Sequence, residues 1–151
     1  MVSESARVTT AAEARFRIDK PNSQPRIVHV IALDAPSADA MATLARGEWN
    51  RASFFAFKEI AADGARFQEA IDPADLVVMV ATAGEKVPNI SAIGEACSRR
   101  RITTTGLILA DPETPTDVLS ASLAALRPWM LMLVIASTVD YIEDMLRALR
   151  A

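Results

Sequence analysis

Residues that often form catalytic or redox sites are scarce in this sequence. Its 151 residues include one cysteine and one histidine. A single cysteine excludes an internal disulfide framework and is typical of a reducing compartment, so we expect a cytoplasmic location. Cys97 has no base near it in the sequence, because His29 is far away and lies within an apolar run. We therefore expect both residues to belong to the core rather than to a nucleophilic site.

Glycine, long apolar runs and net charge are also limited, and each shortage excludes a class of protein. The five glycines form neither G-x-G-x-x-G nor a Walker A motif, so no cofactor is indicated. The longest apolar run, Trp129 to Ala136, is far shorter than the ~20 residues of a membrane helix. The stretch before Lys20 lacks the apolar core of a signal peptide. The net charge of −3 argues against nucleic acid as a partner.

The sequence does contain an alternation of apolar runs and amphipathic segments. The polar stretch Met1 to Pro25 is typical of a flexible leader, and residues 26–151 are long enough for one domain. Runs rich in Val, Ile and Phe predict strands at residues 26–33, 52–57, 75–81, 103–110 and 129–136. Helical patterns are centred on residues 37–46, 89–100, 116–126 and 139–149.

Strands that alternate with helices predict an α/β fold, a three-layer Rossmann-like sandwich with a mostly parallel sheet of about five strands. We expect the strand order second, first, third, fourth, fifth. Residues 58–72 leave two alternatives open. The pair Asp63-Gly64 is a tight-turn signal, which allows an antiparallel edge hairpin outside the second strand. A short helix on either side of the turn is the other interpretation.

The loop after the third strand is the first candidate site. That strand is a continuous apolar run, typical of a parallel strand covered on both faces, and such sheets bind ligands at the carboxyl ends of their strands. The loop places Thr82, Gly84, Lys86 and Asn89 at this edge. The following helix start favours a small anionic ligand. The loop has one glycine and an acid, Glu85, so an ordinary surface loop is the alternative.

The segment DLVVMVATAG, followed by a helix and by ITTTGLIL, resembles the middle of the nucleotide-binding sheet of the tubulin/FtsZ family. The match covers about Asp75 to Leu109, and its specific part is Thr82-Ala83-Gly84. In that family a similar turn precedes a glycine-rich loop that holds the GTP phosphates, whereas EKVPN stands here. The resemblance therefore implies a related sheet and not GTP hydrolysis. A general Rossmann-like kinship explains the same residues equally well.

The loop after the first strand is the second candidate site. Asp34 lies at the end of this strand, where it can bind a ligand hydroxyl or a metal, and Ser37 can cap the next helix. A turn fixed by the Asp34 side chain is the alternative. Three acids after the fourth strand can join Asp34 around Mg²⁺. No ligand spacing supports such a metal site, so we predict none; the three acids are Asp111, Glu113 and Asp117.

Two further features bear on partners. Arg99 to Arg101 complement the end of a helix dipole, or bind a phosphate-bearing ligand or an acidic partner. Aromatic residues gather around the second strand, where they pack in the core or pair with another subunit. These residues are Trp49, Phe54, Phe55, Phe57 and Phe67. The hydrophobic fraction of 51% belongs to a core or to a subunit interface, and we expect a homo-oligomer.

No catalytic constellation is present, so we expect a non-catalytic ligand-binding, regulatory or assembly domain. The alternative is an enzyme that acts on a nucleotide or a phosphorylated small metabolite at the carboxyl ends of the strands. Such an enzyme would use Asp34, Thr82, Lys86 and Asn89.

Overall fold

The computed structural model describes residues 25–151, so all but the last residue of the predicted leader lies outside the described residues. The strands are β1 (Val28–Ala32), β2 (Ala52–Ala56), β3 (Leu76–Thr82), β4 (Thr103–Leu109) and β5 (Met132–Ala136). The helices are α3 (Ala35–Ala45), α4 (Phe57–Ala61), α5 (Gly64–Ile71), α6 (Ser91–Arg99), α7 (Thr116–Leu126), the 3-10 helix η1 (Arg127–Trp129) and α8 (Val139–Ala148).

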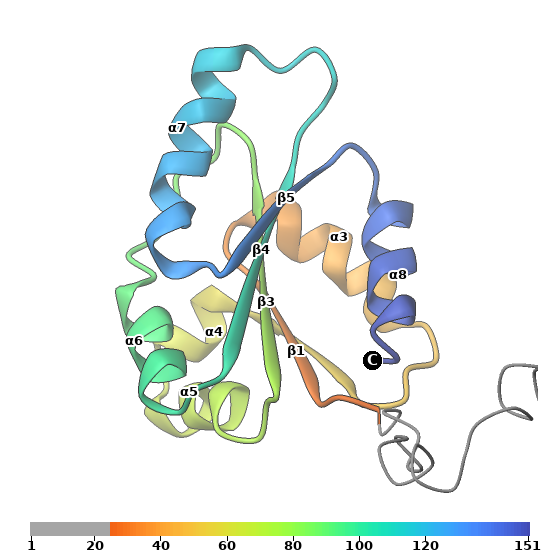
Figure 1. Cartoon of the computed structure of the whole chain (residues 1–151), viewed down its shortest axis with the longest axis vertical. Helices are drawn as coiled ribbons and strands as arrows, with labels where there is room; N and C mark the ends of the chain where they lie inside the picture. Colours follow the sequence, from red (N-terminus) through yellow and green to blue (C-terminus); the bar gives the residue numbers. More distant parts are fainter. Residues whose placement is uncertain (1–24) are drawn as a thin grey trace, which may run out of the picture.

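The strands form one parallel sheet in the order β2-β1-β3-β4-β5. Helices α4, α5, α6 and α7 cover one face of the sheet, and α3 and α8 cover the other (Figure 1). The predicted α/β class, Rossmann-like layering and strand order are confirmed. Strand β5 begins later than predicted, because the chain first makes the tight turn η1.

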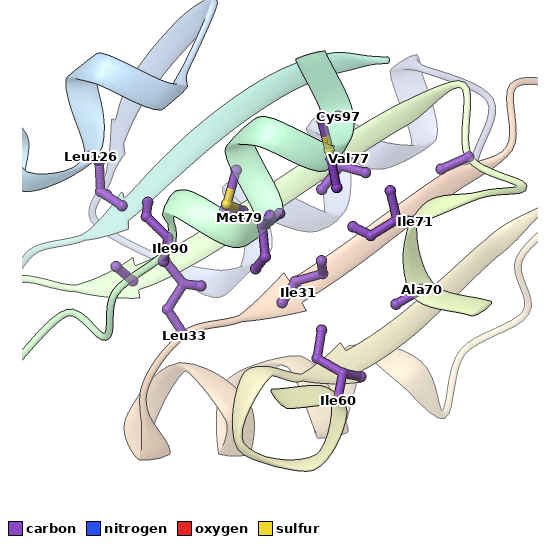
Figure 2. Packing of buried hydrophobic residues seen from close by; sticks show 14 of the residues in the cluster. Ile31, Leu33, Ile60, Ala70, Ile71, Val77, Met79, Ile90, Cys97 and Leu126 are labelled. Atoms are coloured by element: carbon purple, nitrogen blue, oxygen red, sulfur yellow. The ribbon is translucent and has the colours of Figure 1, made fainter. Parts of the chain in front are cut away.

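Successive strand residues point to opposite faces, so the sheet separates two hydrophobic cores. The core under α4 to α7 is drawn in Figure 2, and its labelled members include Ile31, Ile60, Ile71, Met79, Ile90 and Leu126. The core under α3 and α8 includes Val30, Met41, Val78, Leu107, Ile142 and Leu146. Each such side chain contributes about 1.5–3 kcal/mol when fully buried. Both cores are centred on β1, β3 and β4, which leaves the two outer strands less covered.

Residues 58–72 form helices, so the hairpin alternative is wrong and the helical alternative is right. Asp63 is the N-cap of α5, and its side chain accepts a hydrogen bond from the backbone N–H of Ala65 at 2.9 Å. Gly64 is the first residue of that helix. An Asp-Gly pair suits a helix start as well as a tight turn, because a carboxylate satisfies free N–H groups at a helix N-terminus.

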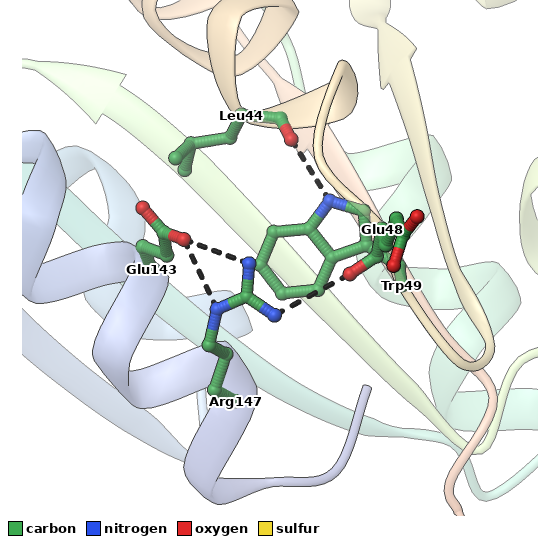
Figure 3. A network of polar contacts seen from close by, with 5 residues as sticks. All are labelled: Leu44, Glu48, Trp49, Glu143 and Arg147. Atoms are coloured by element: carbon green, nitrogen blue, oxygen red, sulfur yellow. Dashed lines mark hydrogen bonds and ion pairs between the residues drawn. The ribbon is translucent and has the colours of Figure 1, made fainter.

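A polar network ties α8 to the connection between α3 and β2 (Figure 3). The Arg147 guanidinium lies 4.6 Å from the ring centroid of Trp49 and donates to the Glu143 carboxylate at 2.8 and 3.0 Å. It also donates to the carbonyl of Glu48 at 3.3 Å. The Trp49 indole N–H donates to the carbonyl of Leu44 at 2.8 Å. These contacts hold α8 beside α3.

Candidate functional site

The two predicted loops follow the neighbouring strands β1 and β3, between which the order of the strands reverses direction. From β1 the chain crosses one face through α3, and from β3 it crosses the other face through α6. The loops after β1 and β3 therefore diverge, and doubly wound sheets commonly bind ligands at such a point. Asp34 and Thr82 lie on the two sides of this point. The sequence thus predicted correctly that these two residues follow neighbouring strands.

The carboxylate of Asp34 is committed to bonds within the fold. It accepts from the backbone N–H of Thr82 at 2.7 Å and from the Thr82 hydroxyl at 2.9 Å. It also accepts from the backbone N–H of Ser37 at 2.8 Å, which makes Asp34 the N-cap of α3. Asp34, and not Ser37 as predicted, is therefore the cap. The alternative interpretation of Asp34, a side chain that fixes its own turn, describes this geometry.

Ser37 is buried and completes a capping box with Asp34. Its hydroxyl oxygen accepts from the Asp34 backbone N–H at 3.2 Å and donates to the Asp34 carbonyl at 3.0 Å. The N-terminal N–H groups of α3 would otherwise attract an anion; here the Asp34 carboxylate satisfies the N–H of Ser37, and Pro36 has no N–H. Asp34, Ser37 and Thr82 form one closed network of hydrogen bonds.

Gly84 shapes the rest of the β3–α6 loop. Its φ of +85° lies in the left-handed region that glycine tolerates best. Its backbone N–H donates to the hydroxyl of Ser122 on α7 at 3.1 Å, which holds the loop against that helix. Between them lies a hollow of about 400 Å³, lined by apolar residues of α7 and by Glu85. An acid at this position opposes the small anionic ligand that the following helix start was predicted to favour.

Lys86 and Asn89 do not join Asp34 in a common site. Both are exposed. The Asn89 side-chain oxygen accepts from the backbone N–H of Ser91 at 3.2 Å, next to the N-cap position of α6, which Ile90 occupies. The six candidate residues therefore fall into a closed network, a glycine turn held by α7, and two exposed side chains.

The acids after β4 serve the local turn. Asp111 accepts from the backbone N–H of Glu113 at 2.8 Å, and Asp117 lies in the first turn of α7. Within residues 25–151, no group of three or more His, Cys, Asp or Glu side chains lies close enough together to hold a metal ion.

His29 and Cys97 are core residues, as predicted. His29 is buried, and its Nδ1–H donates to the carbonyl of Ala70 at 2.7 Å, which ties β1 to α5. Its ring centroid lies 5.1 Å from that of Phe55. Burial raises the pKa of the Cys97 thiol to about 11, against the weaker opposing effect of the Arg100 charge. A thiol that stays protonated at neutral pH is a poor nucleophile.

The feature that the sequence interpretation missed is the outer edge of β5. Leu131, Met132 and Ile135 are 80%, 51% and 48% exposed, and Tyr141 at the start of α8 is 49% exposed. The run that contains the first three of these residues was predicted to be a core strand because it is apolar. A signal was present: no charged residue occurs between Arg127 and Asp140.

The aromatic residues near β2 pack within the chain instead. The ring centroids of Trp49 and Phe54 are 5.6 Å apart, and both residues lie against the core under α3 and α8. Phe55, Phe57 and Phe67 lie against the opposite core. The core interpretation of this cluster is therefore the one that the geometry favours.

Comparisons of the chain with protein-family models, with curated proteins and with solved structures give no match. The resemblance to the tubulin/FtsZ family is thus supported only as far as a parallel, Rossmann-like sheet. None of the helices between residues 25 and 151 has the length and apolar character needed to cross a membrane.

Proposed function

We propose that this chain is a non-catalytic assembly domain that associates with a second copy of itself through the outer edge of β5. The observation that carries the proposal is the exposure of Leu131, Met132 and Ile135 along this edge. Among the described strands β5 pairs only with β4, so alternate backbone N–H and C=O groups on its other side lack a strand partner. An apolar edge of this kind is a template for pairing with another chain.

The opposite edge of the sheet provides a contrast. Strand β2 is flanked by Arg51 and Lys58 and exposes Ser53, and its aromatic residues are partly buried. Charges at an edge strand disfavour pairing with another chain. Around β5 such charges are missing from Pro128 to Val139. The two edges therefore differ in charge, and the uncharged edge at β5 is the one that favours pairing with another chain.

A second copy fits this edge better than an unrelated strand. Antiparallel pairing about a two-fold axis makes the same residues contact each other in both directions. It directs the end that carries Arg127 toward the end that carries Asp140 in the other copy, so opposite charges approach at both margins. Both residues are exposed. The apolar side chains at the uncharged centre of β5 contact the same side chains of the second copy.

The expected dimer is reversible. The exposed parts of the four large side chains amount to roughly 400 Å², about the largest apolar patch of an ordinary monomer. A standard interface takes about 800 Å² from each partner. Parts of α7 and α8 must therefore enter the interface, and the concentration of the protein will decide how much dimer forms.

Sedimentation velocity over a concentration series tests the proposal. We expect the wild-type chain to shift from monomer to dimer as its concentration rises, and the Ile135→Lys variant to remain monomeric, because a buried unpaired charge is costly. The matched control is Ser53→Lys on the β2 edge, which we expect to dimerise like the wild type. A monomeric wild type at every concentration, or equal dimerisation of both variants, would overturn the proposal.

Cross-linking of single cysteines tests the geometry. A two-fold axis brings one position of β5 next to its own copy, and a disulfide needs Cα atoms about 4.4–6.8 Å apart. In a Cys97→Ala background, we expect one or two neighbouring positions among residues 132–136 to cross-link much faster than Ser53→Cys. Equal rates at all positions would argue against a defined strand pairing.

The enzyme alternative stays a prediction. The Asp34 carboxylate and the Thr82 hydroxyl bond each other, and no specific observation favours a reaction at the strand ends.

A further inference from the structure

A second region, at the opposite end of the sheet from the loops after β1 and β3, has the form of a ligand site. A hollow of about 710 Å³ lies between the end of α6, the start of β4 and the η1–β5 connection. Small-molecule sites commonly measure about 300–1,000 Å³. Its apolar lining is Ile102, Pro128, Trp129, Met130 and Leu131. Its polar lining is Glu95, Ser98, Arg99, Arg101, Thr103 and Thr104.

Trp129 forms a fixed aromatic wall of this hollow. Its ring lies directly over Gly94 of α6, where an added Cβ would come within 2.3 Å of Trp129 Cε3. Its carbonyl accepts from the Thr104 hydroxyl at 2.8 Å, which fixes the backbone at the same position. The side chain is half-buried, so part of it stays open to the hollow. A rigid ring that needs no reordering gives a planar ligand a stacking surface at low entropic cost.

Arg99 and Arg101, which line the hollow, differ from Arg100 in their ion pairing. Arg100 is paired with Asp72, at 2.7 Å between Nε and Oδ1, and also donates to the carbonyl of Ala96. Arg99 and Arg101 have no ion pair with any residue in the range 25–151. One acid, Glu95, offsets part of their charge, which leaves the lining with a net positive charge.

Arg101 also has a backbone conformation that suits another residue better. Its φ is +56°, in the left-handed region that favours glycine. The turn is held by a bond from the Arg101 N–H to the Ser98 carbonyl and by one from the Ile102 N–H to the Cys97 carbonyl. These bonds also occupy carbonyls that would otherwise repel an anion at the helix end. An arginine at such a position is consistent with a use for its side chain beyond folding.

We infer that this hollow binds a planar aromatic anion, meaning an aromatic ring that carries a phosphate, sulfonate or carboxylate group. The ring stacks on Trp129, and the anionic group lies between Arg99 and Arg101. Guanidinium groups bind such oxyanions with charge-assisted hydrogen bonds, and the threonine hydroxyls add neutral donors. The inference does not rest on the proposed assembly function, because it concerns a different ligand, although Leu131 belongs to both surfaces.

Isothermal titration calorimetry with 1-naphthyl phosphate tests the inference. 1-Naphthol probes the aromatic half of the ligand, and inorganic phosphate probes the anionic half. We expect 1-naphthyl phosphate to bind at least tenfold more tightly than either. Arg101→Gln and Trp129→Leu should each weaken binding at least tenfold, while Arg46→Gln, an exposed arginine elsewhere, should not. Absence of binding at millimolar probe, equal binding of 1-naphthol, or full affinity in Arg101→Gln would overturn the inference.

Arg101→Gly separates a role in binding from a role in folding. Because glycine tolerates the backbone of this position, we expect a melting temperature equal to or above that of the wild type together with at least tenfold weaker binding. A lower melting temperature with unchanged affinity would assign Arg101 to the fold alone. Titration of Ile135→Lys, a change outside the lining, should give an affinity at least equal to that of the wild type, because this variant leaves Leu131 free of the proposed dimer interface. Loss of binding in that variant would contradict a site contained in one chain.

Discussion

Asp34 joins two elements through one carboxylate. It caps α3 through Ser37 and bonds the end of β3 through Thr82, so one side chain satisfies three donors at the point where the crossovers diverge. The sequence places an acid at the end of a strand, and that position suits both a ligand contact and a cap. Only the backbone positions of Ser37 and Thr82 decide between them, and these depend on the register of β1 against β3.

Replacement of Asp34 by alanine should destabilise the chain markedly. It removes an N-cap and two further charge-assisted bonds, so we expect a loss of about 3 kcal/mol in the free energy of unfolding. Urea denaturation measures this loss. Asp39→Ala, on the exposed side of α3, is the control and should change stability by less than about 0.5 kcal/mol. Equal effects of the two variants would show that the Asp34 network contributes little.

At the scale of elements, the connections were harder to predict than the strands. The apolar runs predicted the existence and type of the five described strands, although β5 begins later than predicted. The pair Asp63-Gly64 was ambiguous, since a turn and a helix N-terminus require the same two residue types. The sequence did not indicate the positive φ of Arg101, because no glycine or asparagine marks this position in the run Arg99 to Arg101.

Replacement of Gly84 and of Gly64 by alanine should change the free energy of unfolding in opposite directions. Gly84 has φ +85°, and an added Cβ would lie 3.2 Å from Val118 Cγ1, so we expect Gly84→Ala to lose about 1–2 kcal/mol. Gly64 begins α5, and an added Cβ meets no atom within 4 Å. Gly64→Ala should therefore gain about 0.4–1 kcal/mol through the unfolded state. Denaturation curves of both variants check the pair, and a shift of the same sign in both would contradict it.

At the scale of the whole molecule, the sheet could be predicted, but which of its strands the helices cover could not. Strand order follows from the alternation of strands and helices. The position of a helix across the sheet depends on three-dimensional contacts, such as the Arg147–Trp49 network that holds α8 beside α3. The same apolar pattern therefore gave a covered strand at β3 and a partly exposed one at β5.

Burial of Cys97 should make the stability of the whole molecule depend on pH in the alkaline range. Its folded-state pKa is raised from 9.0 to about 11, so the unfolded chain loses the thiol proton first. The stability that this group contributes is full below pH 9 and is lost as pH rises toward 11, by up to about 3 kcal/mol. Unfolding free energies of wild type and Cys97→Ala across this range isolate the effect. Parallel curves would contradict it.

The strand order has a consequence for how the chain can fold during synthesis. Strand β2 adds to one side of β1, and β3, β4 and β5 then add one after another to the other side. No later strand has to insert between two that are already paired. Three of the four pairings join strands that are consecutive in the sequence, which keeps loop-closure costs low for a parallel sheet. The sheet can therefore assemble in the order in which the ribosome releases its strands.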